Sequence, residues 1–299
     1  MALSVPNLPY RHDDRALNYG DGCFTTIAFK VGEAQLLNYH VARLSHDAAA
    51  LGISFRDSCV LTPQLNSDPI QITTEDWSRP LQHVIHKLIA QSAHSRGVIK
   101  VLLSRGHGGR GYAPEQSSSP VFIVTEHRFP DHYDNWQQQG IALGISSVRL
   151  GRQPLLAGIK HLNRLEQVLI KQQLALQEHI DDVVVMDERD WVIEASAGNL
   201  FWRNQAGHWC TPLLTHCGVK GVMRQRLSYV LQENGNVLNE NEFLLDDLID
   251  AEAVLVCNAV MGIVPVHTLH THSGVTTQFN IQPVADVSDA VLAAGLQIK

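Results

Sequence analysis

The order of short apolar runs and amphipathic segments is the feature that most restricts the fold of this chain. Near the N-terminus, FTTIAFKVGEAQLL predicts a β-hairpin that turns near Gly32 and Glu33, and apolar spacing predicts helices over residues 38–51 and 81–94. Two further strands, GVIKVLLS and VFIVTEH, flank a glycine-rich loop. Because strands and helices do not alternate regularly, the sequence predicts an α+β or mixed α/β fold rather than a βαβ repeat.

The second half of the chain shows the same mixture after a polar, proline-containing stretch. It contains a predicted strand IALGISSVRL, two strands around a turn at residues 187–190, a helix from about Val222 and a buried segment EAVLVCNAVMGIVPV. The stretch RFPDHYDNWQQQG has the composition of a linker. We therefore predict a first domain over residues 1–125, a linker over 126–136 and a second domain over 137–299.

The composition is that of an ordinary globular protein and excludes several classes. With 299 residues, of which 44% are hydrophobic and 18% charged, the chain can form one large core or two smaller ones. A net charge of −7 and the lack of a Lys/Arg-rich run argue against a nucleic-acid binder. Neither a secretory signal pattern nor an apolar run of roughly 18 residues is visible. Five unclustered cysteines fit reduced thiols in a cytoplasmic protein.

Two features suggest ligands but have simpler explanations. His267, His270 and His272 have no Cys, Asp or Glu close by in the sequence, so we expect a solvated loop and no metal. The loop RGHGGRGY has glycines like those of a phosphate-binding loop, but no helix pattern follows it, so we do not expect a nucleotide site. Its Arg105 and Arg110 are suited to carboxylates, or else are solvated at a flexible hairpin tip.

Lys160 lies in GIKHLNRLEQVLIKQQ, between a loop-like segment and a helix-forming one. Leu162, Leu165, Val168 and Leu169 are spaced by three and four residues, which predicts an apolar stripe that packs inward. Lys160 then enters the fold at the rim of a core. Because buried lysines are rare, this spacing alone favours a helix-start lysine that reaches solvent over one with a chemical role.

Three further positions change that balance. Glu194 in VIEASAGNLFW is predicted in mid-strand, where an acid is either salt-bridged or functional. The helix start near Val222 offers backbone N–H groups to an anion, and Arg43 in HVARL is either a second anion ligand or a surface ion pair. Pyridoxal phosphate requires such a set: a lysine for the Schiff base, an acid for the pyridine nitrogen and an anion site for the phosphate.

The order of these segments resembles that of the fold-type IV pyridoxal-phosphate enzymes, which include branched-chain and D-amino-acid aminotransferases and 4-amino-4-deoxychorismate lyases. The likeness covers nearly the whole chain, and YGDGCFTT, SRGHGGRGY and LAGIKHLNRLEQVLI resemble the lyases most. It implies a small N-terminal α/β domain, a larger C-terminal domain shaped like a pseudo-barrel and a cofactor held between them. It also implies a homodimer that contributes residues across its interface.

The resemblance implies a role for each residue of a cofactor site. Lys160 is implied to form the Schiff base and then to move protons, and Thr26 to place a hydroxyl near the reacting carbon. Glu194 is implied to contact the pyridine nitrogen. The residues implied to hold the phosphate are Arg43 and, through their backbone, Val222 and Met223.

The substrate implied by the resemblance is 4-amino-4-deoxychorismate, with 4-aminobenzoate and pyruvate as products on the way to folate. Lys100 and Arg110 are implied to bind its two carboxylates, and Asn258 to make a polar substrate contact. An aminotransferase on the same fold is the nearest alternative, because it shares the cofactor-binding residues. A catalytically silent scaffold is disfavoured since all of those residues are present. Contact with the aminodeoxychorismate synthase that makes the substrate, and assembly beyond a dimer, are left open.

Overall fold

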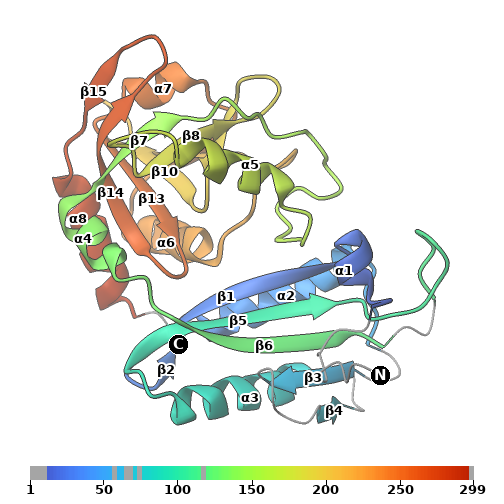
Figure 1. Ribbon diagram of the computed structural model, residues 1–299. Helices are drawn as coiled ribbons and strands as arrows, with labels where there is room; N and C mark the ends of the chain where they lie inside the picture. The colour runs from blue at the N-terminus through green and yellow to red at the C-terminus, as the bar shows by residue number, and fades with distance from the viewer. Residues whose placement is uncertain (1–11, 56–58, 64–69, 73–75, 116–118, 296–299) are drawn as a thin grey trace. The chain divides into compact units, whose positions relative to one another are not determined.

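The structure, a computed structural model, falls into two compact units (Figure 1). The first comprises Met1–Phe129 and Lys160–Asn163, and the second comprises Pro130–Ile159 and Arg164–Lys299. The chain therefore returns to the first unit for a short stretch before it re-enters the second. The residues that the structure describes are 12–55, 59–63, 70–72, 76–115 and 119–295.

The predicted linker over residues 126–136 contains regular structure. Strand β6 (Val121–Arg128) continues into this stretch, and helix α4 (His132–Gln139) begins in it. The chain passes from the first unit to the second between these two elements. The assignment of residues 1–125 and 137–299 as two domains stays a prediction.

In the described part of the first unit, six strands form one mixed sheet. The elements are α1 (Arg15–Tyr19), β1 (Gly22–Lys30), β2 (Glu33–Ala34), α2 (Leu37–Ala50), β3 (Cys59–Pro63), β4 (Ile70–Ile72), α3 (Ser78–Gln91), β5 (Arg96–Ser104) and β6. The strand order is β2-β1-β5-β6-β3-β4. Strands β3 and β6 are parallel, and the other neighbours are antiparallel. This mixture agrees with the predicted α+β or mixed α/β class.

The predicted hairpin and helices of this unit are largely confirmed. Lys30 of β1 lies opposite Glu33 of β2, so Val31 and Gly32 form a two-residue turn. Their positive φ angles of 52° and 80° are typical of the type I′ turn that suits a hairpin. Helix α2 agrees with the prediction over 38–51. Helix α3 begins three residues before the predicted start at Leu81, since Pro80 is tolerated in the first helical turn.

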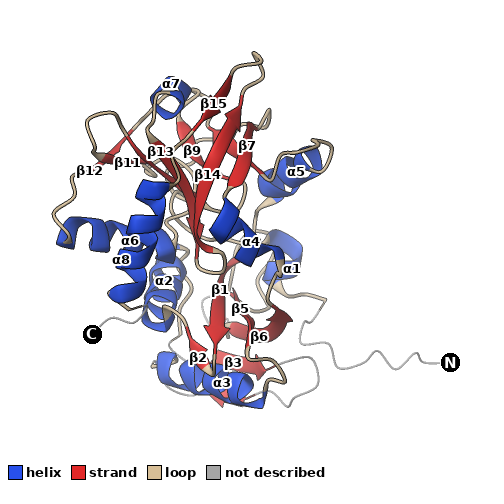
Figure 2. Ribbon diagram, turned by 90° about the vertical axis from the view of Figure 1, so that its left-hand side faces the viewer, coloured by secondary structure: helices blue, strands red, loops and turns tan. Residues whose placement is uncertain are grey.

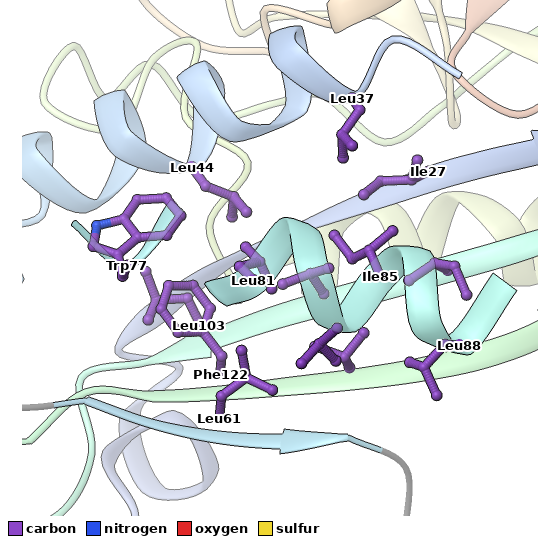
Figure 3. Close-up of a cluster of buried hydrophobic side chains, with 14 of the residues drawn as sticks. Ile27, Leu37, Leu44, Leu61, Trp77, Leu81, Ile85, Leu88, Leu103 and Phe122 are labelled. Carbon is purple, nitrogen blue, oxygen red and sulfur yellow. The ribbon is translucent and has the colours of Figure 1, made fainter. Parts of the chain in front are cut away.

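The core of the first unit lies between its helices and its sheet. Figure 3 shows Leu44 of α2 and Leu81 and Ile85 of α3 pointing toward buried side chains of the strands, among them Leu103 and Phe122. Each fully buried aliphatic side chain of this kind stabilises the fold by about 1.5–3 kcal/mol. The sheet is therefore covered on this face, and its other face carries half-buried polar and aromatic residues of β1.

In the described part of the second unit, nine strands form a second sheet. Its further elements are β7 (Ile141–Ile145), α5 (Leu165–Leu174), β8 (Asp182–Met186), β9 (Val192–Ala195), β10 (Asn199–Arg203), β11 (Trp209–Pro212), α6 (Val222–Glu233), β12 (Leu238–Asn241), α7 (Leu245–Ile249), β13 (Ala253–Asn258), β14 (Gly262–His270), β15 (Thr276–Gln278) and α8 (Gln282–Ala293). The order is β12-β11-β10-β13-β14-β7-β8-β9, with β15 on β14. Strand β9 ends this order yet contacts β10 and β11, so the sheet curls toward closure as the resemblance implies.

The second core fills this curled sheet. Trp202 and Leu200 of β10 and Val254 and Val256 of β13 are buried in it, and the ring centroids of Trp202 and Phe243 are 4.8 Å apart. Helices α6 and α8 pack against each other and against β13 (Figure 2). Strand β7 ends five residues earlier than the predicted strand over 141–150.

The prediction of an inward-facing stripe on the helix after Lys160 is wrong. Helix α5 begins five residues after Lys160, and its side chains Leu165, Val168 and Leu169 are 76%, 50% and 50% exposed. Ile170 is its one buried residue. Apolar periodicity identifies a helix face, but it does not state what covers that face.

The prediction that His267, His270 and His272 lie in a solvated loop is also wrong in part. His267 and His270 lie within strand β14, where they are half-buried, and His272 lies in the turn before β15. Within the described residues, no group of three or more His, Cys, Asp or Glu side chains is placed to hold a metal ion. The same residues include no helix with the length and apolar character for crossing a membrane. All five cysteines are buried free thiols.

Candidate functional site

Lys160 lies in an extended segment that pairs with the start of β1. Phe24 N–H donates to the Lys160 carbonyl at 3.0 Å, Leu162 N–H donates to the Gly22 carbonyl at 3.0 Å, and Cys23 lies opposite His161. Lys160 is thus the cross-strand neighbour of Phe24 rather than the first residue of a helix. In an antiparallel pair, such neighbours project on the same face of the sheet.

This face of the first sheet gathers three of the predicted site residues. Thr26 of β1 lies opposite Lys100 of β5, and Phe24 lies two residues before Thr26 on the same face. The Lys160 Nζ is 4.5 Å and the Lys100 Nζ 5.3 Å from the centroid of the Phe24 ring. Two amines therefore lie over one aromatic ring, whose π-face attracts cations, and Thr26 lies on the same sheet face.

The guanidinium of Arg43, on α2, has one nitrogen that is hydrogen-bonded and another that lacks a partner among the described residues. Its Nη2 donates to the Thr25 Oγ1, whereas its buried Nε has no hydrogen-bond partner among the described residues. Burial lowers the pKa of Arg43 to about 10, against the opposing effect of the Asp47 carboxylate. An unsatisfied N–H on a buried guanidinium is costly unless an anion or another acceptor occupies the space beside it.

His40 is a fully buried residue that the sequence reasoning missed. Its Nδ1 lies 2.6 Å from the Thr25 Oγ1, and its Nε2 has no hydrogen-bond partner among the described residues. Burial, followed by the charges of Arg43 and Lys160, holds the pKa of His40 well below its ordinary value. The two cations near this buried ring, Arg43 and Lys160, are groups that attract anions.

Asp47 joins Lys160 to α2. Its carboxylate is buried, and its Oδ2 accepts a hydrogen bond of 3.1 Å from the Lys160 backbone N–H. Helix α2 therefore carries Arg43 and His40 and also anchors the lysine-bearing segment. Sequence spacing predicted the helix, but its pairing with a segment 113 residues away was not readable from it.

Glu194 of β9, in the second unit, is buried and fully engaged. Its Oε2 accepts from the Val219 backbone N–H at 2.9 Å, and its Oε1 accepts from the Arg164 Nη2 and the Gln167 Nε2, each at 3.4 Å. The sequence left open whether this acid is salt-bridged or functional. These donors fix the position of the carboxylate, so the ion pair is compatible with a role in binding a cation.

The start of α6 lies in the same unit as Glu194. The two are linked through Val219, which lies just before the helix and whose N–H donates to Glu194. Its N-cap residue is Gly221, and no side chain caps the helix among the described residues. Asn199 donates from Nδ2 to the Val219 carbonyl at 2.8 Å and accepts from the Gly221 N–H at 3.1 Å, so it fixes the turn that leads into the helix. Val222 and Met223 are buried, and their helix-start N–H groups are suited to an anion.

The arginines of the glycine-rich loop have different roles. Arg105 donates to the Asp21 carboxylate at 2.7 Å and to the carbonyls of Leu51 and Gly52, so it holds the end of α2. Arg110 is exposed in the loop, and its side chain extends toward solvent. Both arginines were predicted to suit carboxylates. Arg105 is engaged within the unit, whereas the exposed Arg110 can reach a ligand.

Asn258, at the end of β13, uses its side-chain amide within the second unit. Its Nδ2 donates to the Ala197 carbonyl at 3.0 Å, and its Oδ1 accepts from the Val260 and Met261 N–H groups, each at 2.8 Å. The side chain therefore joins two turns. Its predicted contact with a substrate stays a prediction.

The predicted residues thus form one group in each unit. The first unit brings together Lys160, Thr26 and Lys100 on one sheet face, and Arg43 lies on α2, the helix whose Asp47 binds the Lys160 backbone N–H. The second unit brings Glu194 to the turn before α6 through Val219. Pattern reasoning missed His40, Asn199 and Arg164 because each acts through partners that are distant in the sequence.

Comparisons with known proteins identify the family and the fold. Residues 22–269 match the family described as amino-transferase class IV. The chain is 38% identical over 265 residues to an aminodeoxychorismate lyase from Vibrio harveyi, which covers 88% of this chain and 89% of that protein. A crystal structure of 4-amino-4-deoxychorismate lyase from Pseudomonas aeruginosa is 31% identical, with a TM-score of 0.80 over 98% of this chain and 96% of that one. The branched-chain amino acid aminotransferase of Escherichia coli, at 18% identity and a TM-score of 0.76 over 95% and 88% of the two chains, shares the fold.

Proposed function

The chain belongs to the class IV aminotransferase family, and we propose that it is a lyase that converts 4-amino-4-deoxychorismate to 4-aminobenzoate and pyruvate. The observation that carries the proposal is the 38% identity to the Vibrio harveyi lyase along 88% of the chain. The reaction supplies the 4-aminobenzoate part of folate. Enzymes of this fold-type IV family use pyridoxal phosphate, so the residues of this chain must be compatible with that cofactor.

The described residues fit pyridoxal phosphate. Within the described part of the chain, Arg43 has a buried N–H without a partner, and the start of α6 has N–H groups without a side-chain cap, so both suit a phosphate. Glu194 is a fixed, buried carboxylate of the kind that keeps a pyridine nitrogen protonated. Lys160 supplies the amine for the Schiff base. When bound, the cofactor provides a conjugated cationic ring that withdraws electrons from the carbon next to the substrate nitrogen.

Lys160 carries the proton transfers in this proposal. Its Nζ takes the proton from the substrate carbon that bears the amino group, the carbon–oxygen bond to the enolpyruvyl group breaks, and the bonding electrons leave with the oxygen. A proton from Lys160 then completes pyruvate, and the other product becomes aromatic. Proton transfer by a positioned amine contributes on the order of 10²- to 10⁴-fold in rate. Thr26 lies on the same sheet face and is assigned to assist that transfer.

Lys100 and Arg110 are assigned to the two substrate carboxylates, and Asn258 to a polar substrate contact. Lys100 is exposed on the sheet face that carries Thr26, and Arg110 is exposed in its loop, so both cations are available to an anionic ligand. Two cations match a dianionic substrate. An aminotransferase on the same fold would share the cofactor residues, but it would need a keto acid to complete its cycle.

A homodimer is part of the proposal. The exposed side chains of Leu165, Val168 and Leu169 on α5 support it, because apolar residues grouped on one helix face are typical of an interface. Sedimentation equilibrium on the wild-type chain and on Val168→Glu tests this assembly, and a monomeric wild-type chain would contradict it. A contact with the synthase that makes the substrate is tested by co-sedimentation of the two enzymes.

A cytoplasmic location is also proposed. Five buried free cysteines support a reducing compartment, since thiols persist where glutathione keeps them reduced. Cell fractionation with an antibody against the chain measures the location directly.

The central experiment measures the products with purified protein loaded with pyridoxal phosphate. We expect 4-aminobenzoate and pyruvate in equal amounts from aminodeoxychorismate without any keto acid, together with a visible absorption band of the bound cofactor. Lys160→Ala removes the band and the activity. Lys30→Ala, an exposed lysine of β1, is the matched control and keeps both. Turnover that depends on pairing an amino acid with a keto acid would make the chain an aminotransferase instead.

A further inference from the structure

Arg15 is a buried arginine to which the proposed function assigns no role. It is 3% exposed at the start of α1. Its Nη1 donates to the Gly111 carbonyl at 3.1 Å and approaches the Gly108 carbonyl at 3.4 Å, and its Nη2 donates to the Tyr112 carbonyl at 3.0 Å. One guanidinium thus binds three carbonyls of the glycine-rich loop, some 93–97 residues away along the chain.

The loop that Arg15 binds is tightly turned around Arg110. Gly108, Gly109 and Gly111 have φ angles of 101°, 84° and 59°, which residues other than glycine rarely adopt. Arg110 and Ala113 exchange two backbone hydrogen bonds of 3.1 and 3.2 Å. The carbonyls on either side of Arg110 therefore face Arg15, while the Arg110 side chain is exposed.

Arg15 is itself held in place. Its Nε donates to the Asp21 Oδ2 at 2.8 Å, the same oxygen that Arg105 reaches at 2.7 Å. Burial raises the pKa of Asp21, but the hydrogen bonds and charges of Arg105 and Arg15 outweigh it and keep that pKa below its ordinary value. Asp21 therefore stays ionised and fixes two guanidiniums, of which one holds the loop and the other the end of α2.

We propose that Arg15 is a positioning residue that holds the glycine-rich loop in the conformation in which Arg110 binds a substrate carboxylate. The inference rests on the proposed function, because that function assigns Arg110 to a carboxylate. Glycine-rich backbone has many accessible conformations, and each must be excluded before Arg110 binds with a defined geometry. Arg15 excludes the other loop conformations before the substrate binds. A lysine cannot replace it, because one ammonium cannot span three carbonyls and a carboxylate as a planar fork does.

The first measurement is hydrogen exchange of the Arg110 and Ala113 amides in the cofactor-loaded enzyme, which requires no substrate. We expect Arg15→Met to accelerate both amides by about tenfold or more, since their mutual hydrogen bonds depend on a fixed loop. Arg105→Met is the matched control: it also removes a guanidinium from Asp21, but its other contacts are with α2. It leaves the two loop amides unchanged.

The second measurement is the kinetics of Arg15→Met, Arg110→Met and the double variant. We expect each single variant to lower kcat/KM by roughly 10- to 100-fold, mainly through KM, with the visible cofactor band unchanged. The double variant should be no worse than Arg110→Met alone, because Arg15 acts through Arg110. Arg15→Lys keeps the charge, should not restore KM, and replaces Arg15→Met if that variant does not fold.

The outcomes separate the inference from the proposed function. Unchanged exchange of the loop amides in the Arg15 variants overturns the inference, and so do multiplicative effects of Arg15→Met and Arg110→Met. If Arg110→Met leaves KM unchanged, the assignment of Arg110 under the proposed function is wrong and the inference fails with it. Accelerated exchange together with non-additive KM effects supports the inference.

Discussion

Acidification should destabilise the first unit through His40, because its imidazole is buried and uncharged in the folded chain. Burial and the charges of Arg43 and Lys160 hold the pKa of His40 well below its ordinary value of about 6.5. Between the two pKa values the unfolded chain binds a proton that the folded chain does not. The stability that His40 contributes is therefore present above about pH 6.5 and is lost as the pH falls below it.

The magnitude follows from proton linkage. From pH 7.5 to 5.5 the unfolded chain takes up most of one proton at this position, which lowers the free energy of unfolding by about 1.4 kcal/mol. The chain has 16 histidines, so the contribution of His40 must be isolated by comparison. A His40→Gln variant cannot gain this proton, although it loses stability at every pH through changed packing around Thr25.

The assay is urea unfolding of the cofactor-free chain at pH 7.5 and 5.5, followed by fluorescence and circular dichroism. We expect the loss of unfolding free energy between the two pH values to be about 1.4 kcal/mol smaller in His40→Gln than in the wild type. His86→Gln, which removes an exposed histidine of helix α3, is the matched control. Equal losses in the wild type and His40→Gln would refute the account of a neutral, buried His40.

Three further predictions concern the anion site, the second core and the thiols. Arg43→Met should weaken pyridoxal phosphate binding by on the order of 100-fold but leave the binding of pyridoxal unchanged, as measured by titration of the cofactor-free chain, because it removes the buried charge that the proposed function assigns to the phosphate. Trp202→Ala should lower the free energy of unfolding by about 3–5 kcal/mol in urea, since its fully buried ring would leave a cavity. Burial raises the pKa of Cys23, Cys217 and Cys257 to about 12, so the folded chain should react with a thiol reagent at pH 8 far more slowly than the urea-unfolded chain.

Several features of this protein were determined by local sequence. The hairpin, whose turn at Val31 and Gly32 lies one residue before the predicted one, the extent of α2 and the start of α6 at Val222 follow from turn residues and apolar periodicity, which act over a few residues. The mixed α/β class follows from the order of such elements. The role proposed for Lys160 came from a resemblance over nearly the whole chain, because the spacing around that lysine alone favoured a solvent-exposed side chain.

Other features were decided by tertiary structure, because their cause lies in residues far apart in the chain. Periodicity identified the apolar face of α5, but only the fold shows that Leu165 is exposed, since packing partners are not encoded in spacing. The sequence predicted His267 and His270 to be loop residues, whereas strand pairing places them in β14. The burial of Arg15 depends on a loop more than 90 residues away, and no local pattern distinguishes it from a solvated arginine. Local sequence thus set the elements and their order, and long-range contacts decided which polar side chains the fold holds fixed.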